Sequence, residues 1–221
     1  MKDLCKPDPR NSVFNITPET LEESLSKVKI SRKVPKKIQE MLEFSKKICL
    51  YGYYEYDFYT LSSVYLFLLT ETAIKERFLN ELPKKCHLRK KNKLKEITKN
   101  YRAVYDHLWK GWSIEGYEKV NRSLGSILKW LYDHQVLPKR VSEFETKTLK
   151  NLRNESAHLT RKNILTPGMV IPILWKVIDF VNCLFDPKVH NKEPESLRRT
   201  REFYTEVFQE AKKITKKSKK K

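Results

Sequence analysis

The stretch DFYTLSSVYLFLLTETAIKERFLNE, residues 57–81, constrains the fold more than any other part of this 221-residue chain. Its large apolar residues recur at helical spacing on two sides of a helix. One side carries Phe58, Leu61, Tyr65, Leu68 and Thr72, and the other carries Val64, Phe67, Ile74 and Phe78. A helix that is apolar on nearly all sides lies at the centre of its bundle. We therefore predict a central helix from Asp57 to Glu81. The tyrosine-rich stretch 51–60 at its entry either packs in the core or stacks on nucleic-acid bases.

Other segments repeat the helical pattern, and prolines separate several of them. We predict further helices over 18–29, 35–49, 97–109, 114–134, 142–158, 167–184 and from residue 196 onward. Only 5 glycines are present, which is few for the turns of an all-β fold, and we detect no alternating strand pattern. The expected fold is therefore an all-α bundle of about seven to nine helices. We divide the chain into an N-terminal extension with a short helix (1–30), a helical domain (31–190) and a C-terminal helix with a basic tail (191–221).

The formal net charge is +19, which indicates a polyanionic partner. Nucleic acid is the first candidate, and an anionic membrane surface is the second. The basic stretch 84–95 has few apolar residues, so we expect a loop or a poorly packed helix. Within it, Lys84, Lys85, Arg89, Lys90 and Lys91 are candidate substrate-binding residues. The alternative is that they form a solvated loop.

Several features indicate a cytoplasmic protein that works without a cofactor. The 4 cysteines are scattered and none shows C-x-x-C spacing, which is typical of a reducing compartment. We find no run of 18 apolar residues and no apolar segment near the N-terminus, so we expect no membrane span and no secretion signal. Since the sequence contains no P-loop, GxGxxG, HExxH or Cys/His cluster, we expect neither a metal nor an organic cofactor.

The stretch LRNESAHLT, residues 152–160, places three polar groups on a predicted amphipathic helix. At 100° per residue, Leu152 and Leu159 share the core-facing side, whereas Asn154 and His158 lie almost opposite. Those two are four residues apart, so the amide can bond the imidazole and select its tautomer. Arg153 is about 140° from His158 on the same wheel. Bringing them together would need the long arginine side chain, an early helix end or a second subunit.

These side chains suit the cleavage of RNA by its own 2′-hydroxyl. An imidazole transfers protons near neutral pH, and a guanidinium stabilises the charge that develops on the phosphate. The nucleophile belongs to the substrate, so a metal is not required. The spacing alone is weak evidence, since Arg102 and His107 have it too. We treat that second pair as a coincidence, because an alanine follows its arginine where the first pair has an asparagine.

The motif LRNESAH resembles the signature of the HEPN superfamily, in which an arginine and a polar residue precede a histidine at such a distance. The segment 57–78 is similar to the long aromatic-rich helix that precedes the motif in many HEPN proteins, and the likeness covers about residues 35–186. The resemblance implies a helical bundle that dimerises and brings two motifs together across a shared cleft. Many HEPN proteins are metal-independent endoribonucleases of toxin–antitoxin, abortive-infection and CRISPR systems.

By this resemblance, Arg153 would stabilise the phosphate, Asn154 would position groups and His158 would transfer protons. The implied partners are RNA, a second copy of the chain and a protein antitoxin or other defence-system partner. Some HEPN domains have lost catalysis and only bind or scaffold. A catalytically inactive, basic nucleic-acid-binding or scaffold module therefore remains the alternative to an endoribonuclease.

Overall fold

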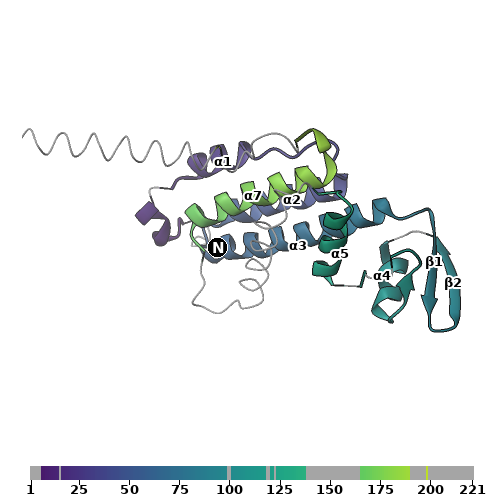
Figure 1. Ribbon diagram of the computed structural model, residues 1–221. Coiled ribbons are helices and arrows are strands. Elements are labelled where there is room, and N and C mark those ends of the chain that lie inside the picture. The colour runs from purple at the N-terminus through teal and green to yellow at the C-terminus, as the bar shows by residue number, and fades with distance from the viewer. Residues whose placement is uncertain are drawn as a thin grey trace, which may run out of the picture.

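The computed structural model describes residues 6–14, 16–98, 101–117, 120–121, 123–137, 165–189 and 198. Helices α2, α3 and α7 lie side by side, and a small sheet extends beyond the C-terminal end of α3 (Figure 1). The elements, in chain order, are η2 (Pro9–Phe14), α1 (Pro18–Ser26), α2 (Lys36–Tyr51), α3 (Asp57–Glu81), β1 (Lys85–Lys90), β2 (Lys93–Thr98), α4 (Tyr101–Trp109), β3 (Ser113–Ile114), α5 (Leu124–Asp133), α7 (Pro167–Phe185) and η3 (Pro187–Val189).

Helix α3 has the bounds that the sequence predicts and is about 37 Å long. It contacts α2, α5 and α7 and so lies at the centre of the described bundle. It is not buried on all sides, however, because Leu61 and Leu68 expose 44% and 46% of their surface. Its most buried side includes Ser62, whose hydroxyl lies 3.1 Å from that of Ser45 on α2. These small side chains let the two helices approach closely, which a count of large apolar residues does not reveal.

The expectation of an all-α fold is wrong, because β1, β2 and β3 form a three-stranded antiparallel sheet in the order β2-β1-β3. The stretch expected to be a loop or a poorly packed helix is in fact the β1–β2 hairpin. Alternate residues Cys86 and Leu88 are buried, which is the two-residue period of a strand. The many lysines hide this short alternation. The turn at Lys91 and Asn92 places Lys91 at a φ of 52°, in the left-handed region.

Two predicted helices begin later than expected because sheet pairing takes up their first residues. Ile97 belongs to β2, and the helix expected from residue 97 begins at Tyr101. Ile114 belongs to β3, and the helix expected from residue 114 begins at Leu124. There the Ser123 hydroxyl accepts a hydrogen bond from a backbone N–H of the first turn, as N-cap residues do. The predicted helix over 142–158 and the one beginning at residue 196 lie outside the described residues.

Helix α7 is, by length and composition, apolar enough to cross a membrane. The expectation of no membrane span overlooked this helix because Lys176 and Asp179 interrupt its apolar run. In the structure it packs along α3, and Val170, Leu174 and Val181 are fully buried. A core helix of a folded domain has the same length and composition.

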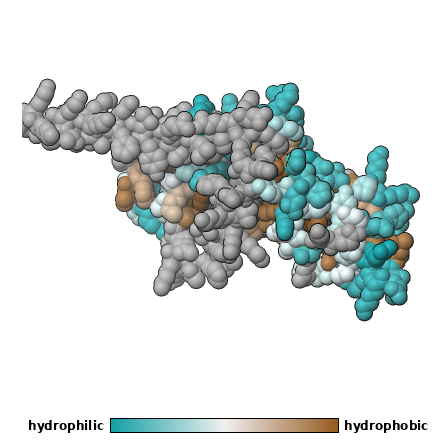
Figure 2. Space-filling model, viewed as in Figure 1, coloured by the Kyte–Doolittle hydropathy of each residue, from teal (hydrophilic) through white to brown (hydrophobic). Residues whose placement is uncertain are grey.

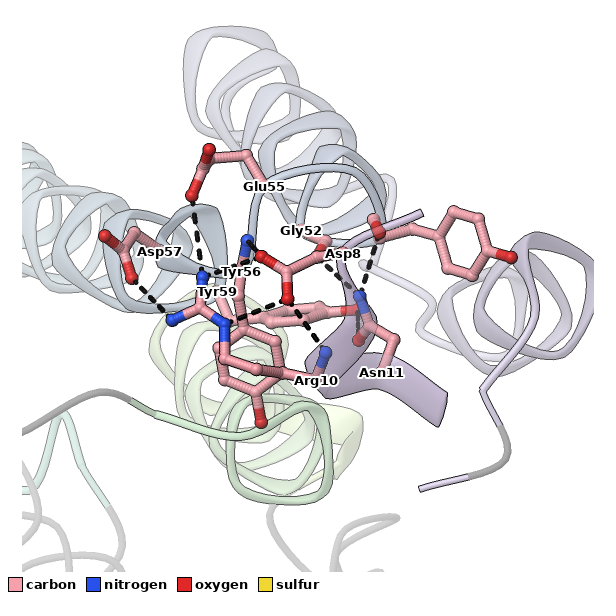
Figure 3. Close-up of polar contacts among 9 residues, drawn as sticks. Asp8, Arg10, Asn11, Gly52, Glu55, Tyr56, Asp57 and Tyr59 are labelled. Atoms are coloured by element: carbon pink, nitrogen blue, oxygen red, sulfur yellow. Dashed lines mark hydrogen bonds and ion pairs between the residues drawn. The ribbon is translucent and has the colours of Figure 1, made fainter. Parts of the chain in front are cut away.

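The N-terminal segment docks on the junction between α2 and α3 through a polar cluster (Figure 3). Asn11 is 1% exposed; its amide donates to the carbonyl groups of Gly52 and Tyr53 at 3.1 and 2.8 Å. The Tyr59 hydroxyl donates to the Asn11 side-chain oxygen at 3.1 Å. Helix α1 then adds Leu21 and Leu25 to the same apolar core. Residues of η2 and α1 therefore pack against the helical bundle.

Beside Asn11, Arg10 holds the carboxylate of Asp8 and stacks on an aromatic ring (Figure 3). Its guanidinium donates to both carboxylate oxygens at 2.9 and 2.7 Å, and lies 4.6 Å from the centre of the Tyr56 ring. These hydrogen bonds lower the pKa of Asp8 to about 2. The cluster fixes the N-terminal segment, so we regard it as structural.

Candidate nucleic-acid interface

The three predicted catalytic residues, Arg153, Asn154 and His158, lie outside the described residues. Their roles therefore remain predictions from the sequence. Of the pair treated as a coincidence, His107 lies on α4.

The five predicted substrate-binding residues all lie on the basic hairpin, which we define as residues 84–98. This segment contains seven Lys or Arg residues and one Glu, so its charge alone attracts polyanions. Directly opposed residues of an antiparallel pair share one face of the sheet. The outer face carries Lys85, His87, Arg89, Leu94 and Glu96, and the inner face carries Cys86, Leu88, Lys90, Lys93, Lys95 and Ile97. Lys84 lies in the bend before β1.

The inner face is the one that packs against α4. Leu88 pairs with Ile114 of β3, and both side chains are fully buried. Val104 and Leu108 of α4 are buried in the same apolar core. Burying these apolar side chains on both sides stabilises the hairpin against α4 and gives its lysines a fixed position.

Acidic groups neutralise part of the outer face. Lys85 lies 3.1 Å from Glu96, and Arg89 lies 3.7 Å from Glu115. His87 is 4.0 Å from the same Glu96 carboxylate. Two of the five predicted binding residues, Lys85 and Arg89, therefore have carboxylate partners, which makes them weaker candidates for phosphate contacts.

The charge balance at the tip and on the inner face of the hairpin differs from that on the outer face. No ion pair among the described residues includes Lys90, Lys91, Lys93 or Lys95. Lys90 and Lys93 are even opposed directly across the two strands, an arrangement that like charges disfavour. Such a concentration of unneutralised ammonium groups is the electrostatic signature of an anion-binding surface. Lys90 and Lys91 are thus the strongest of the predicted binding residues.

Two of these lysines contact α4 directly. The Lys90 ammonium donates to the carbonyl oxygen of Lys110 at 2.6 Å, just after the helix ends. The Lys95 ammonium lies 3.2 Å from Nε2 of His107, whose Nδ1 lies 2.6 Å from the carbonyl oxygen of Ala103. A carbonyl only accepts, so Nδ1 carries the hydrogen, and Nε2 is left to accept from Lys95. His107 therefore contacts the basic surface through Nε2.

Aromatic side chains border the same surface. The ring of Trp112 meets the His107 ring edge-on at 5.8 Å, and Trp109 at the end of α4 is 70% exposed. Hydrophilic side chains gather over the end of the molecule formed by the hairpin, with apolar patches among them (Figure 2). The sequence alone did not single out Lys93, Lys95 or Trp109 as candidate binding residues. The alternation of Cys86 and Leu88 is a local signal for the first strand of the hairpin, but it is short and gives no information on the contacts with α4.

Comparisons of this chain with protein-family models, with curated proteins and with solved structures found no match. The resemblance to HEPN proteins is therefore neither supported nor opposed by them.

Proposed function

We propose that this protein binds RNA through the inner face and tip of the basic hairpin. One observation carries the proposal: carboxylates neutralise basic groups of the outer face, whereas Lys90, Lys91, Lys93 and Lys95 have no carboxylate partner among the described residues. A phosphate backbone supplies anions at short, regular intervals, which suits a row of lysines. The aromatic rings beside them favour nucleic acid over an anionic membrane surface, because they offer faces on which bases stack.

We further propose that the bound RNA is cleaved by HEPN-type chemistry at the motif LRNESAH. The 2′-hydroxyl oxygen attacks the adjacent phosphorus and loses its proton to His158 acting as the base. Arg153 stabilises the charge on the phosphate, and Asn154 selects the tautomer of the imidazole. The bond to the 5′-oxygen breaks, and that oxygen takes up a proton, leaving 2′,3′-cyclic phosphate and 5′-hydroxyl ends. The sequence motif supports this step, and no metal ion takes part in it.

The resemblance also supports a homodimer, in which a second copy of the motif completes the cleft. We propose a role as a toxin or phage-defence effector that a protein antitoxin restrains. Light scattering of the purified chain tests the dimer, since one subunit has a mass of 26.4 kDa. A monomer at micromolar concentration would contradict that part of the proposal.

The binding proposal is tested by anisotropy of a labelled RNA as salt is varied. We expect the double variant Lys93→Gln, Lys95→Gln to weaken binding. It should also reduce the slope of log K against log salt by about 1.4 if each lysine contacts one phosphate of a single strand. The matched control is Lys36→Gln, because Lys36 is 89% exposed and belongs to α2, not to the hairpin or α4. Equal weakening by the control, or stronger binding to anionic vesicles than to RNA, would refute the proposed site.

The cleavage proposal is tested by incubating purified protein with total RNA in EDTA. Wild-type protein should convert the RNA into fragments, and His158→Ala or Arg153→Ala should each abolish this without changing the circular dichroism spectrum. His87→Ala is the control, since His87 is exposed on the outer face of the hairpin. Salt-sensitive binding without any cleavage would instead identify a catalytically inactive RNA-binding or scaffold module. Strict dependence on added Mg²⁺ would exclude the proposed mechanism.

A further inference from the structure

The imidazole of His107 is held in one orientation beside the basic hairpin. Its Nδ1 lies 2.6 Å from the carbonyl oxygen of Ala103, one turn earlier in α4, and the ring of Trp112 meets it edge-on at 5.8 Å. The carbonyl fixes the hydrogen on Nδ1, so the lone pair of the neutral ring is on Nε2. Nε2 lies 3.2 Å from the ammonium of Lys95, a residue that is exposed to solvent. The second nitrogen of the ring therefore lies where a bound anion can reach it.

The charged groups around His107 are mostly basic. The elements that pack against α4 contribute Lys90 at the end of β1, Lys93 and Lys95 on the inner face of β2, and Lys75 of α3 with its partner Glu71. The helix and the residue after it add Arg102, Asp106 and Lys110. No ion pair among the described residues includes His107, whereas His87 lies near Glu96. An anion that reaches Nε2 therefore meets several ammonium groups as well.

We propose that Lys95 and His107 form one phosphate-binding subsite. A phosphate of the bound RNA accepts one hydrogen bond from the Lys95 ammonium and one from Nε2 of the protonated imidazole, and the extra proton comes from the solvent. The inference rests on the proposed RNA binding and adds to it a residue that contacts phosphate. Without the anion, a hydrogen on Nε2 would face the ammonium directly, because a lysine side chain only donates. A phosphate between the two groups accepts from both and removes this conflict.

The subsite makes the binding of RNA depend on pH. Because the phosphate and the proton each favour the binding of the other, the affinity for RNA rises as the pH falls. An imidazole takes up its second proton between about pH 8 and pH 5. A phosphodiester keeps its single negative charge over this range, so the change in affinity originates in the protein.

The experiment measures the dissociation constant of a labelled oligouridine at pH 8 and at about pH 5.5. The oligouridine lacks terminal phosphates, since a phosphate monoester titrates in this range and uracil does not. All proteins carry His158→Ala, so that the RNA stays intact and this histidine does not titrate. We expect the affinity to rise about tenfold at the lower pH, the effect of one charge-assisted hydrogen bond, and His107→Gln to reduce the rise to about twofold. The matched control, His87→Gln on the outer face of the hairpin, should keep the full rise.

Nitrogen NMR of the imidazole rings gives a second measurement that needs no substitution at His107. At about pH 6.5, adding the oligouridine should move the Nε2 signal of His107 toward that of a protonated nitrogen and leave His87 unchanged. If the affinity does not rise, if His107→Gln keeps the full rise or if the Nε2 signal does not move, while Lys93→Gln, Lys95→Gln weakens binding, the subsite is refuted and RNA binding stands. If the oligouridine binds at neither pH, both fail.

Discussion

Replacing Asn11 with alanine should cost about 3 kcal/mol of the free energy of unfolding. The side chain is 1% exposed and makes three hydrogen bonds, to two backbone carbonyls and to the Tyr59 hydroxyl. Truncation leaves the carbonyl of Gly52 and the hydroxyl of Tyr59 buried without these partners. Each unsatisfied buried group costs about 1–3 kcal/mol. The carbonyl of Tyr53 is only partly buried, so water can replace its bond at little cost.

Urea unfolding followed by circular dichroism measures this loss. A decrease of about 3 kcal/mol corresponds to a melting temperature lower by about 6–12 °C for a chain of this size. Tyr59→Phe removes one end of the same network, so its cost and that of Asn11→Ala should not add in the double variant. Ser12→Ala is the control, because its exposed hydroxyl bonds only the carbonyl of Pro9. A cost below about 0.5 kcal/mol for Asn11→Ala would refute the idea that this network holds the N-terminal segment.

Four further substitutions test other parts of the fold by the same unfolding measurement. Gly52→Ala should destabilise the fold strongly, since an added Cβ would lie 2.5 Å from the ring of Tyr59. In contrast, a Cβ added at Gly125 in α5 would meet nothing within 4 Å, so Gly125→Ala should stabilise the fold by about 0.5 kcal/mol. The lowered pKa of Asp8 stabilises the fold above about pH 4, and this contribution is lost as the pH falls toward 2. Asp8→Asn should therefore cost about 1 kcal/mol at pH 7, after a discount for the half-exposed guanidinium, and little near pH 2. Gln135, just after the end of α5, has a φ of 57°, a left-handed conformation that glycine adopts more easily than glutamine. Gln135→Gly should therefore stabilise the fold by about 1 kcal/mol. Destabilisation would contradict the left-handed conformation.

The sequence alone determined the long helices. Local conformational preferences of neighbouring residues account for the bounds of α3, the capping box at Thr17 and the proline at the start of α1. Periodicity at 3.6 residues over many turns is a strong signal, so the helices of the bundle were recognisable. What periodicity could not reveal was which side of α3 is buried, because the close contact at Ser45 and Ser62 depends on the partner helix.

Only the tertiary structure decided the sheet and the charge balance of the candidate interface. Each strand of the basic hairpin is six residues long and carries two apolar side chains among four polar or charged ones, so its alternation is too short to outweigh its composition. Which lysines lack carboxylate partners depends on strand register and on Glu115, which lies in sequence far from Arg89. His107 meets Lys95 only because α4 folds back over the sheet. Local propensity acts over a few residues, whereas these contacts join residues that the fold alone brings together.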